Sequence, residues 1–151
     1  MFRTAVESDI PRVADDMRES DVVEVYNSHR HTPIEALTYS FEVSQLCITI
    51  VYGGRPVAMF GIVPTGAAEA SIWLLGNNGL REMWVTFLKL SRAFIEMFLQ
   101  GYPFLYNYVD AANETTIRWL TWCGAKFGEP EIYGQQGCLF RRFVIERNSY
   151  V

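Results

Sequence analysis

Two consecutive glycines, Gly53 and Gly54, separate two apolar, β-branched runs, and this pattern constrains the fold more than any other feature. The runs span residues 46–52 and 56–63. Glycine adopts the positive φ angles that two-residue hairpin turns require, so we expect two antiparallel strands joined by a tight turn. Residues 70–75 form another apolar run and predict a further strand.

Residues 80–100 predict a long helix, because apolar side chains cover about half of its circumference and an ordinary surface helix carries a narrower apolar stripe. We expect this helix to pack on the sheet and on a neighbouring element. The remaining patterns predict strands at 2–5 and 104–109, helices at 9–19, 21–27, 33–41 and 114–123, a loop at 27–31, and a hairpin of 126–132 with 139–146. This order indicates a mixed α/β domain, with a central sheet and helices on both faces.

Four residues carry recognisable helix-start signals. Thr32 is placed to cap a helix whose first residue is a proline, and Glu35 can complete a capping box. Asn113 and Ser8 are also of the types that cap helices. We therefore expect helices to begin directly after residues 8, 32 and 113.

The composition excludes several classes of protein. The 151 residues suit one domain, 1–151. The net charge of −4 argues against a surface that tracks nucleic acid. Three widely spaced cysteines argue against a disulfide framework or a zinc site. The N-terminal segment carries charges where a signal peptide needs an apolar run, so we expect no signal peptide. No apolar run reaches the roughly 20 residues of a membrane helix, so we expect no membrane span.

Four segments, taken in their order and spacing, resemble the GNAT-like phage proteins, a group that includes the internal virion protein A of short-tailed phages. They are Asp-Val-Val-Glu at 21–24, Thr-Pro-Ile-Glu-Ala-Leu at 32–37, Ile-Trp-Leu-Leu-Gly at 72–76 and Tyr-Pro-Phe-Leu-Tyr-Asn-Tyr-Val-Asp at 102–110. The resemblance implies the N-acetyltransferase fold, with a mixed, mostly antiparallel sheet. It also implies a role in the virion or host cytoplasm, with other virion proteins or a second copy as partners.

The phosphate loop departs from the pattern of active GNAT enzymes, which reads Arg/Gln-x-x-Gly-x-Gly/Ala. Here the nearest segment is residues 76–81, in which only Gly79 matches and Arg81 replaces the final small residue. Small residues let backbone amides approach a phosphate closely. The resemblance places any acetyl-CoA contacts on Leu75, Gly76, Gly79, Arg81 and Asn113.

The predicted helix at 114–123 also departs from the pattern of active GNAT enzymes. Many GNAT enzymes carry a tyrosine seven residues after the opening asparagine, as a general acid. The equivalent residue here is Leu120, which cannot donate a proton. We therefore expect a catalytically degenerate virion component or assembly factor that needs no cofactor. The alternative is an acetyl-CoA-dependent N-acetyltransferase acting on an amine.

Other candidates for chemistry are few. Asp21 and Glu24 lie three residues apart and could share a helix face, where Glu24 could act as a base. Asn107 lies among apolar neighbours in a predicted strand, so it either fastens the splayed strands or contacts a ligand. His29 and His31 have no further ligands at metal-binding spacing, so we expect no metal site.

The helix at 114–123 carries two tryptophans, Trp119 and Trp122, beside Arg118. One short helix cannot turn both indoles and its aliphatic stripe toward the same sheet. Trp and Arg are the commonest hot-spot residues of protein interfaces. We therefore expect Trp119 or Trp122, with Arg118, to form a contact with another chain.

Overall fold

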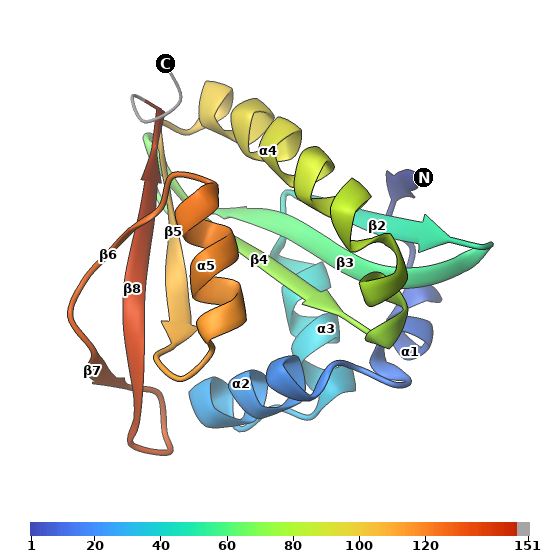
Figure 1. The fold of residues 1–151 in the computed structure, drawn as a ribbon, viewed down its shortest axis with the longest axis horizontal. Coiled ribbons are helices and arrows are strands. Elements are labelled where there is room, and N and C mark those ends of the chain that lie inside the picture. Colours follow the sequence, from blue (N-terminus) through green and yellow to red (C-terminus); the bar gives the residue numbers. More distant parts are fainter. Residues whose placement is uncertain (148–151) are drawn as a thin grey trace.

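The computed structural model describes residues 1–147, and eight strands in this part of the chain form one sheet (Figure 1). Their order is β1-β2-β3-β4-β5-β8-β6, and β7 pairs with β8 outside this path. The strands are β1 (Phe2–Thr4), β2 (Leu46–Tyr52), β3 (Arg55–Pro64), β4 (Glu69–Gly76), β5 (Phe104–Asp110), β6 (Lys126–Phe127), β7 (Glu131–Tyr133) and β8 (Cys138–Glu146).

Helices cover both faces of the sheet, which confirms the predicted mixed α/β class (Figure 1). One face carries α4 (Trp84–Gly101) and α5 (Glu114–Trp122), and a short 3₁₀ helix, η1 (Asn78–Met83), leads into α4. The other carries α1 (Asp9–Ala14), α2 (Glu19–His29) and α3 (Pro33–Val43). A separate buried apolar cluster fills the space between the sheet and each helical layer.

The predicted hairpin and its covering helix are confirmed. β2 and β3 pair in antiparallel fashion, and Gly53 and Gly54 take φ angles of 60° and 75° in the turn between them. Phe87 and Phe98 of α4 are buried against the sheet. Phe94 packs its ring edgewise on Phe60 of β3 at 4.6 Å between centroids.

Two of the three predicted caps form. Thr32 Oγ1 accepts the Glu35 amide while Glu35 Oε1 accepts the Thr32 amide, which completes the capping box. Asn113 Oδ1 accepts the Thr116 amide at 3.2 Å. Ser8 makes no side-chain cap. Instead, the buried Asp9 carboxylate accepts the Val6 amide together with bonds from Arg3 and Thr49.

Three predicted boundaries are wrong for local reasons. α1 ends at Ala14 rather than near residue 19, because Asp16 takes a positive φ of 60° and turns the chain away. α2 continues through His29 into the predicted loop and ends where Arg30 adopts the left-handed conformation. The C-terminal hairpin uses two separate short strands, β6 and β7, against β8.

The sheet opens between β4 and β5, which form its one parallel pair. Ladder pairing joins residues 69–71 to 104–106 and then stops, although both strands continue. Because the strands diverge beyond residue 71, side chains from both helical layers meet in the opening. Along residues 1–147, every helix is too short or too polar to span a lipid bilayer.

Candidate functional site

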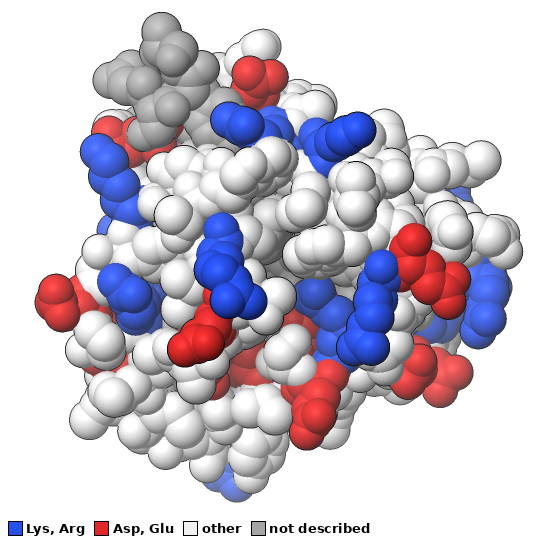
Figure 2. Space-filling model, viewed as in Figure 1, with Lys and Arg blue, Asp and Glu red and all other residues white. Residues whose placement is uncertain are grey.

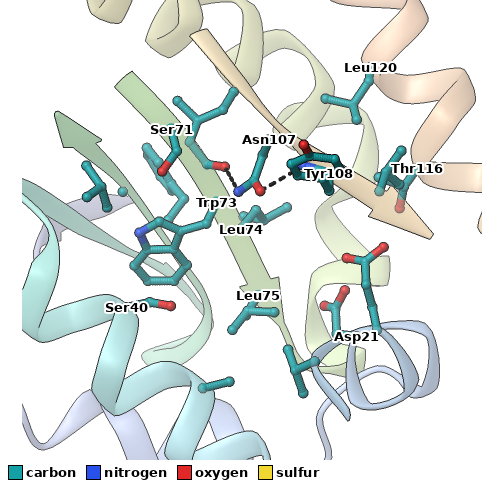
Figure 3. Close-up of a pocket in the computed structure, with 18 of the residues that line it drawn as sticks. Asp21, Ser40, Ser71, Trp73, Leu74, Leu75, Asn107, Tyr108, Thr116 and Leu120 are labelled. Carbon is teal, nitrogen blue, oxygen red and sulfur yellow. Dashed lines mark hydrogen bonds between the residues drawn. The ribbon is translucent and has the colours of Figure 1, made fainter. Parts of the chain in front are cut away.

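A cavity of about 550 Å³ occupies the opening between β4 and β5 (Figure 3). Asn107 bridges the two strands there. Its Nδ2 donates to the carbonyl oxygen of Ile72 at 2.7 Å, and its Oδ1 accepts the Tyr108 amide at 2.8 Å. These bonds correspond to the fastening role, one of the two roles that the sequence left open for Asn107.

Glu24 of α2 lies in the cavity wall, where it contacts the end of β5. Its Oε1 accepts the Asp110 amide at 2.9 Å. Burial raises the pKa of Glu24 to about 7, and the charges of Asp21 and Asp110 add to the rise, whereas the Asp110 amide and the Asn113 side chain oppose it. Glu24 therefore exchanges a proton near neutral pH.

Asp21 lies one helical turn before Glu24 and is buried. Its Oδ2 accepts two bonds from the Arg18 guanidinium, at 2.9 and 2.8 Å, and one from the Gly76 amide at 3.0 Å. Figure 3 shows its side chain rising from α2 beside the end of β4. The predicted pair therefore shares one helix face, but Asp21 holds α2 to β4 while Glu24 faces the cavity.

Aromatic rings line the cavity on the side of α2. Tyr108 and Tyr133 stack with their ring centroids 4.0 Å apart, and His29 meets Tyr133 edge-on at 6.1 Å. His31 lies between His29 and Tyr39, at 5.6 and 5.9 Å. Sequence patterns alone do not indicate Tyr39, Tyr108 or Tyr133 as cavity residues, because α3, β5 and β7 meet α2 only in the folded chain.

Within residues 1–147, no group of three or more His, Cys, Asp and Glu side chains is arranged to hold a metal ion. Cys123 is fully buried at the end of α5, where its Sγ lies 3.9 Å from Ser91 Oγ.

The loop that follows β4 has its backbone donors paired within the protein. Five consecutive amides, those of residues 76–80, each donate a hydrogen bond to the chain. The Gly76 amide donates to Asp21 Oδ2 at 3.0 Å, the Asn77 amide to Val57 O at 2.8 Å and the Asn78 amide to Asp16 O at 3.0 Å. The Gly79 amide donates to Asn77 Oδ1 at 2.9 Å, and the Leu80 amide donates to Asn77 O at 3.1 Å. A diphosphate would have to displace these acceptors to reach the amides.

The loop glycines also serve internal packing. A Cβ added at Gly79 would lie 2.7 Å from Cγ1 of Val57, and one added at Gly76 would lie 3.2 Å from the Val57 carbonyl oxygen. The small size of both residues is therefore needed where the loop lies on β3. In this arrangement the amides of residues 76–80 are donors to the chain itself and are not free for a phosphate.

The other residues that the resemblance assigned to acetyl-CoA have structural places. Leu75 is buried beneath α1 and α3. Leu120, which the resemblance places at the general-acid position rather than at the cofactor, is buried beneath α4. Arg81 is exposed in η1. Asn113 caps α5, and its Nδ2 is buried without a well-formed hydrogen bond to the residues that the structure describes.

The two tryptophans of α5 have different surroundings. Trp119 is partly buried against Phe87, and its Nε1 donates to Ser91 Oγ at 3.1 Å. Trp122 is 45% exposed, and the Arg92 guanidinium lies 4.6 Å from its ring centroid. Arg118 is exposed on the same helix. Figure 2 shows this face of the molecule, where Lys and Arg side chains are interspersed with Asp and Glu side chains among uncharged residues.

The sequence matches no family model. It is 29% identical to the probable scaffold protein gp13 of Escherichia phage T7 over 133 residues, which cover 83% of this chain and 91% of that protein.

Solved structures with a similar fold include N-acetyltransferases. The aminoglycoside enzyme AAC(6')-Ib, solved with ribostamycin and coenzyme A, has a TM-score of 0.71 at 14% identity, covering 99% of this chain and 94% of its own. The ribosomal-protein-alanine N-acetyltransferase of Brucella melitensis has a TM-score of 0.69 at 15% identity, covering 95% and 97%. At these identities the likeness establishes the GNAT-like fold and leaves the activity open.

Proposed function

We propose that this protein is a non-catalytic GNAT-fold component of a phage particle, or a factor in its assembly. The observation that carries the proposal is the loop of residues 76–80, whose five amides already donate within the chain. A phosphate-binding loop needs such amides free, because they and the helix start that follows supply the donors. The similarity to a probable phage scaffold protein supports the same role.

The energetics favour the closed loop. A hydrogen bond within the protein makes a net contribution of about 1 kcal/mol to stability, and an acceptor left buried without its donor costs about 1–3 kcal/mol. Opening the loop for a diphosphate would leave the buried Asp21 carboxylate without its Gly76 donor. The binding energy of the cofactor would first have to offset these losses.

We place the partner surface on α5 and the adjoining part of α4. Trp122, with Arg92 lying on its ring, presents an exposed indole and a guanidinium together. The exposed Arg118 and the partly buried Trp119 extend this surface. Its partners are other virion proteins or a second copy, and the protein is located in the virion and in the host cytoplasm during assembly, as an internal virion protein would be.

The proposal is tested with purified phage particles. Quantitative mass spectrometry should find the protein in mature particles or in an assembly intermediate, and Trp122→Ala should lower its incorporation. Ile132→Ala removes another strongly exposed apolar side chain, on β7, and is the matched control. Absence from particles and intermediates, with unchanged assembly in its absence, would contradict the structural role.

An N-acetyltransferase is the second candidate. It is favoured by Glu24, a cavity carboxyl whose pKa lies near 7, because a general base works best when its pKa is close to the operating pH. Glu24 would then accept a proton from an amine, and acetyl-CoA would supply the acyl group. Acetyl transfer that disappears in Glu24→Gln would support this candidate over the first.

A further inference from the structure

The cavity mouth beside α2 combines negative charge with aromatic rings. We define this acidic-aromatic mouth by Glu24, His29, Tyr39, Tyr108 and Tyr133, all of which line the cavity. Asp110 lies directly behind Glu24 and donates its amide to it. The mouth therefore presents a carboxyl group at its inner end and ring faces or edges around it.

Glu24 has no cationic partner among residues 1–147. The two salt bridges there join Arg3 to Asp9 and Arg18 to Asp21. Arg18 donates through Nε and Nη2 to Asp21, at 2.9 and 2.8 Å, so its ion pair is with Asp21 and not with Glu24. A partly buried carboxylate without a cation is costly, and a cation supplied by another molecule would stabilise it.

Aromatic rings narrow the choice of cation. Cations are attracted to ring faces, and a guanidinium also stacks flat on them, which an ammonium does not. Tyr108 and Tyr133 already stack nearly parallel, with an interplanar angle of 15°. The same protein holds guanidinium groups over rings at 4.6 to 5.1 Å, at Trp122, Tyr106 and Phe127.

We propose that the acidic-aromatic mouth binds an arginine side chain presented by a partner protein. The guanidinium would pair with Glu24, and its aliphatic stem would lie along the tyrosine rings. This inference rests on the proposed structural role and assigns one part of the partner's chemistry. It involves a different face from the tryptophan surface of α5.

Capped pentapeptides with a central arginine, citrulline or lysine test this inference. Citrulline matches arginine in shape but carries no charge. We expect the arginine peptide to bind, with amide NMR shifts centred on Glu24, Tyr108 and Tyr133, and the citrulline peptide to bind about tenfold more weakly. The lysine peptide should also be weaker, because it lacks the stacking guanidinium.

Variants distinguish binding at the acidic-aromatic mouth from attraction to negative charge elsewhere on the protein. Glu24→Gln should weaken the arginine peptide about tenfold, while Glu19→Gln, an exposed change on the same helix, should leave its affinity unchanged. Tyr133→Leu should weaken it while keeping the charge of the mouth. Melting curves of each variant confirm that it is folded.

The affinity should also rise with pH through about 7, as Glu24 ionises. The groups that face Glu24 are Asp21 on α2, Asp110 on β5 and Asn113 on α5. His29 lies at the rim, and burial lowers its pKa. As the pH rises, His29 loses its positive charge and no longer repels an arginine, so it also raises the affinity with pH.

Several outcomes would overturn the inference. Equal binding of the citrulline peptide would remove the role of charge, and equal or tighter binding of the lysine peptide would indicate an amine site. Shifts confined to α5, or no binding at about 5 mM peptide, would also contradict it. None of these outcomes bears on whether the protein binds coenzyme A or enters particles, so the proposed function would stand or fall separately.

Discussion

Asn107 joins β5 to β4 through a 2.7 Å hydrogen bond from its Nδ2 to the carbonyl oxygen of Ile72, just beyond the point where the strands stop pairing. One side chain thus replaces a missing backbone contact at the opening. Its Oδ1 accepts the Tyr108 amide, so both polar ends of the side chain are satisfied. The width of the cavity is therefore set in part by Asn107.

Asn107→Leu tests this fastening role. Leucine has nearly the same size but leaves the Ile72 carbonyl and the Tyr108 amide without their partner, so we expect a loss of about 1–3 kcal/mol of folding free energy. Urea denaturation measures it. Asn78→Ala, which removes exposed hydrogen bonds to Asp16, should cost less than Asn107→Leu. An equal cost for both changes would argue against the role.

Gly79→Ala tests whether the loop glycine serves packing or a cofactor. The added methyl group would meet Val57 at 2.7 Å, so the variant should lose about 1–3 kcal/mol of stability. Gly101→Ala is the control, because a Cβ there meets nothing within 4 Å and alanine favours helix. Unchanged stability in Gly79→Ala would mean that the loop has room for a ligand.

Glu24→Gln should stabilise the protein in alkaline but not in acid solution. The folded protein raises the pKa of Glu24 from about 4.5 to about 7, so wild-type stability falls as the pH rises from the lower value to the higher one. The wild-type free energy of unfolding falls by at most about 3 kcal/mol over this range. The glutamine variant does not show this fall, because glutamine has no carboxyl group to ionise. Urea denaturation near pH 5 and pH 8 measures the difference. The opposite pH dependence would contradict the raised pKa.

The two tryptophans should respond differently to truncation. Trp119→Ala removes a partly buried ring and its bond to Ser91, so it should lower the melting temperature, with a cost of about 3 kcal/mol. Trp122→Ala should change stability little and weaken association instead, typically by about 2 kcal/mol at a hot spot. Thermal melting and sedimentation report the two effects. Loss of stability in both variants, with normal assembly, would argue against an interface on α5.

The elements that were predicted correctly carry their signals locally. Gly53 and Gly54 specify a turn by conformation alone, and Thr32 and Glu35 satisfy each other three residues apart. The end of α1 was missed because aspartate is not the usual residue at a positive φ, as Asp16 has here.

The site was less predictable, because its contacts join distant parts of the chain. Glu24 was a candidate by type, but its raised pKa comes first from burial in the folded chain, where it meets Asp110, 86 residues away. The sequence showed that Arg81 replaces the final small residue of the phosphate-loop pattern. The loop amides donate to Asp21, Val57 and Asp16 because α2, β3 and the connection between α1 and α2 pack against the loop, which only the folded structure shows.

Calorimetric titration of the purified protein with coenzyme A and acetyl-CoA tests the central claim most directly. The account predicts no binding, or binding weaker than physiological cofactor concentrations could saturate, because the amides of residues 76–80 are already paired. A dissociation constant of about 1 μM or tighter, equivalent to roughly −8 kcal/mol, would contradict the closed loop and favour the enzyme.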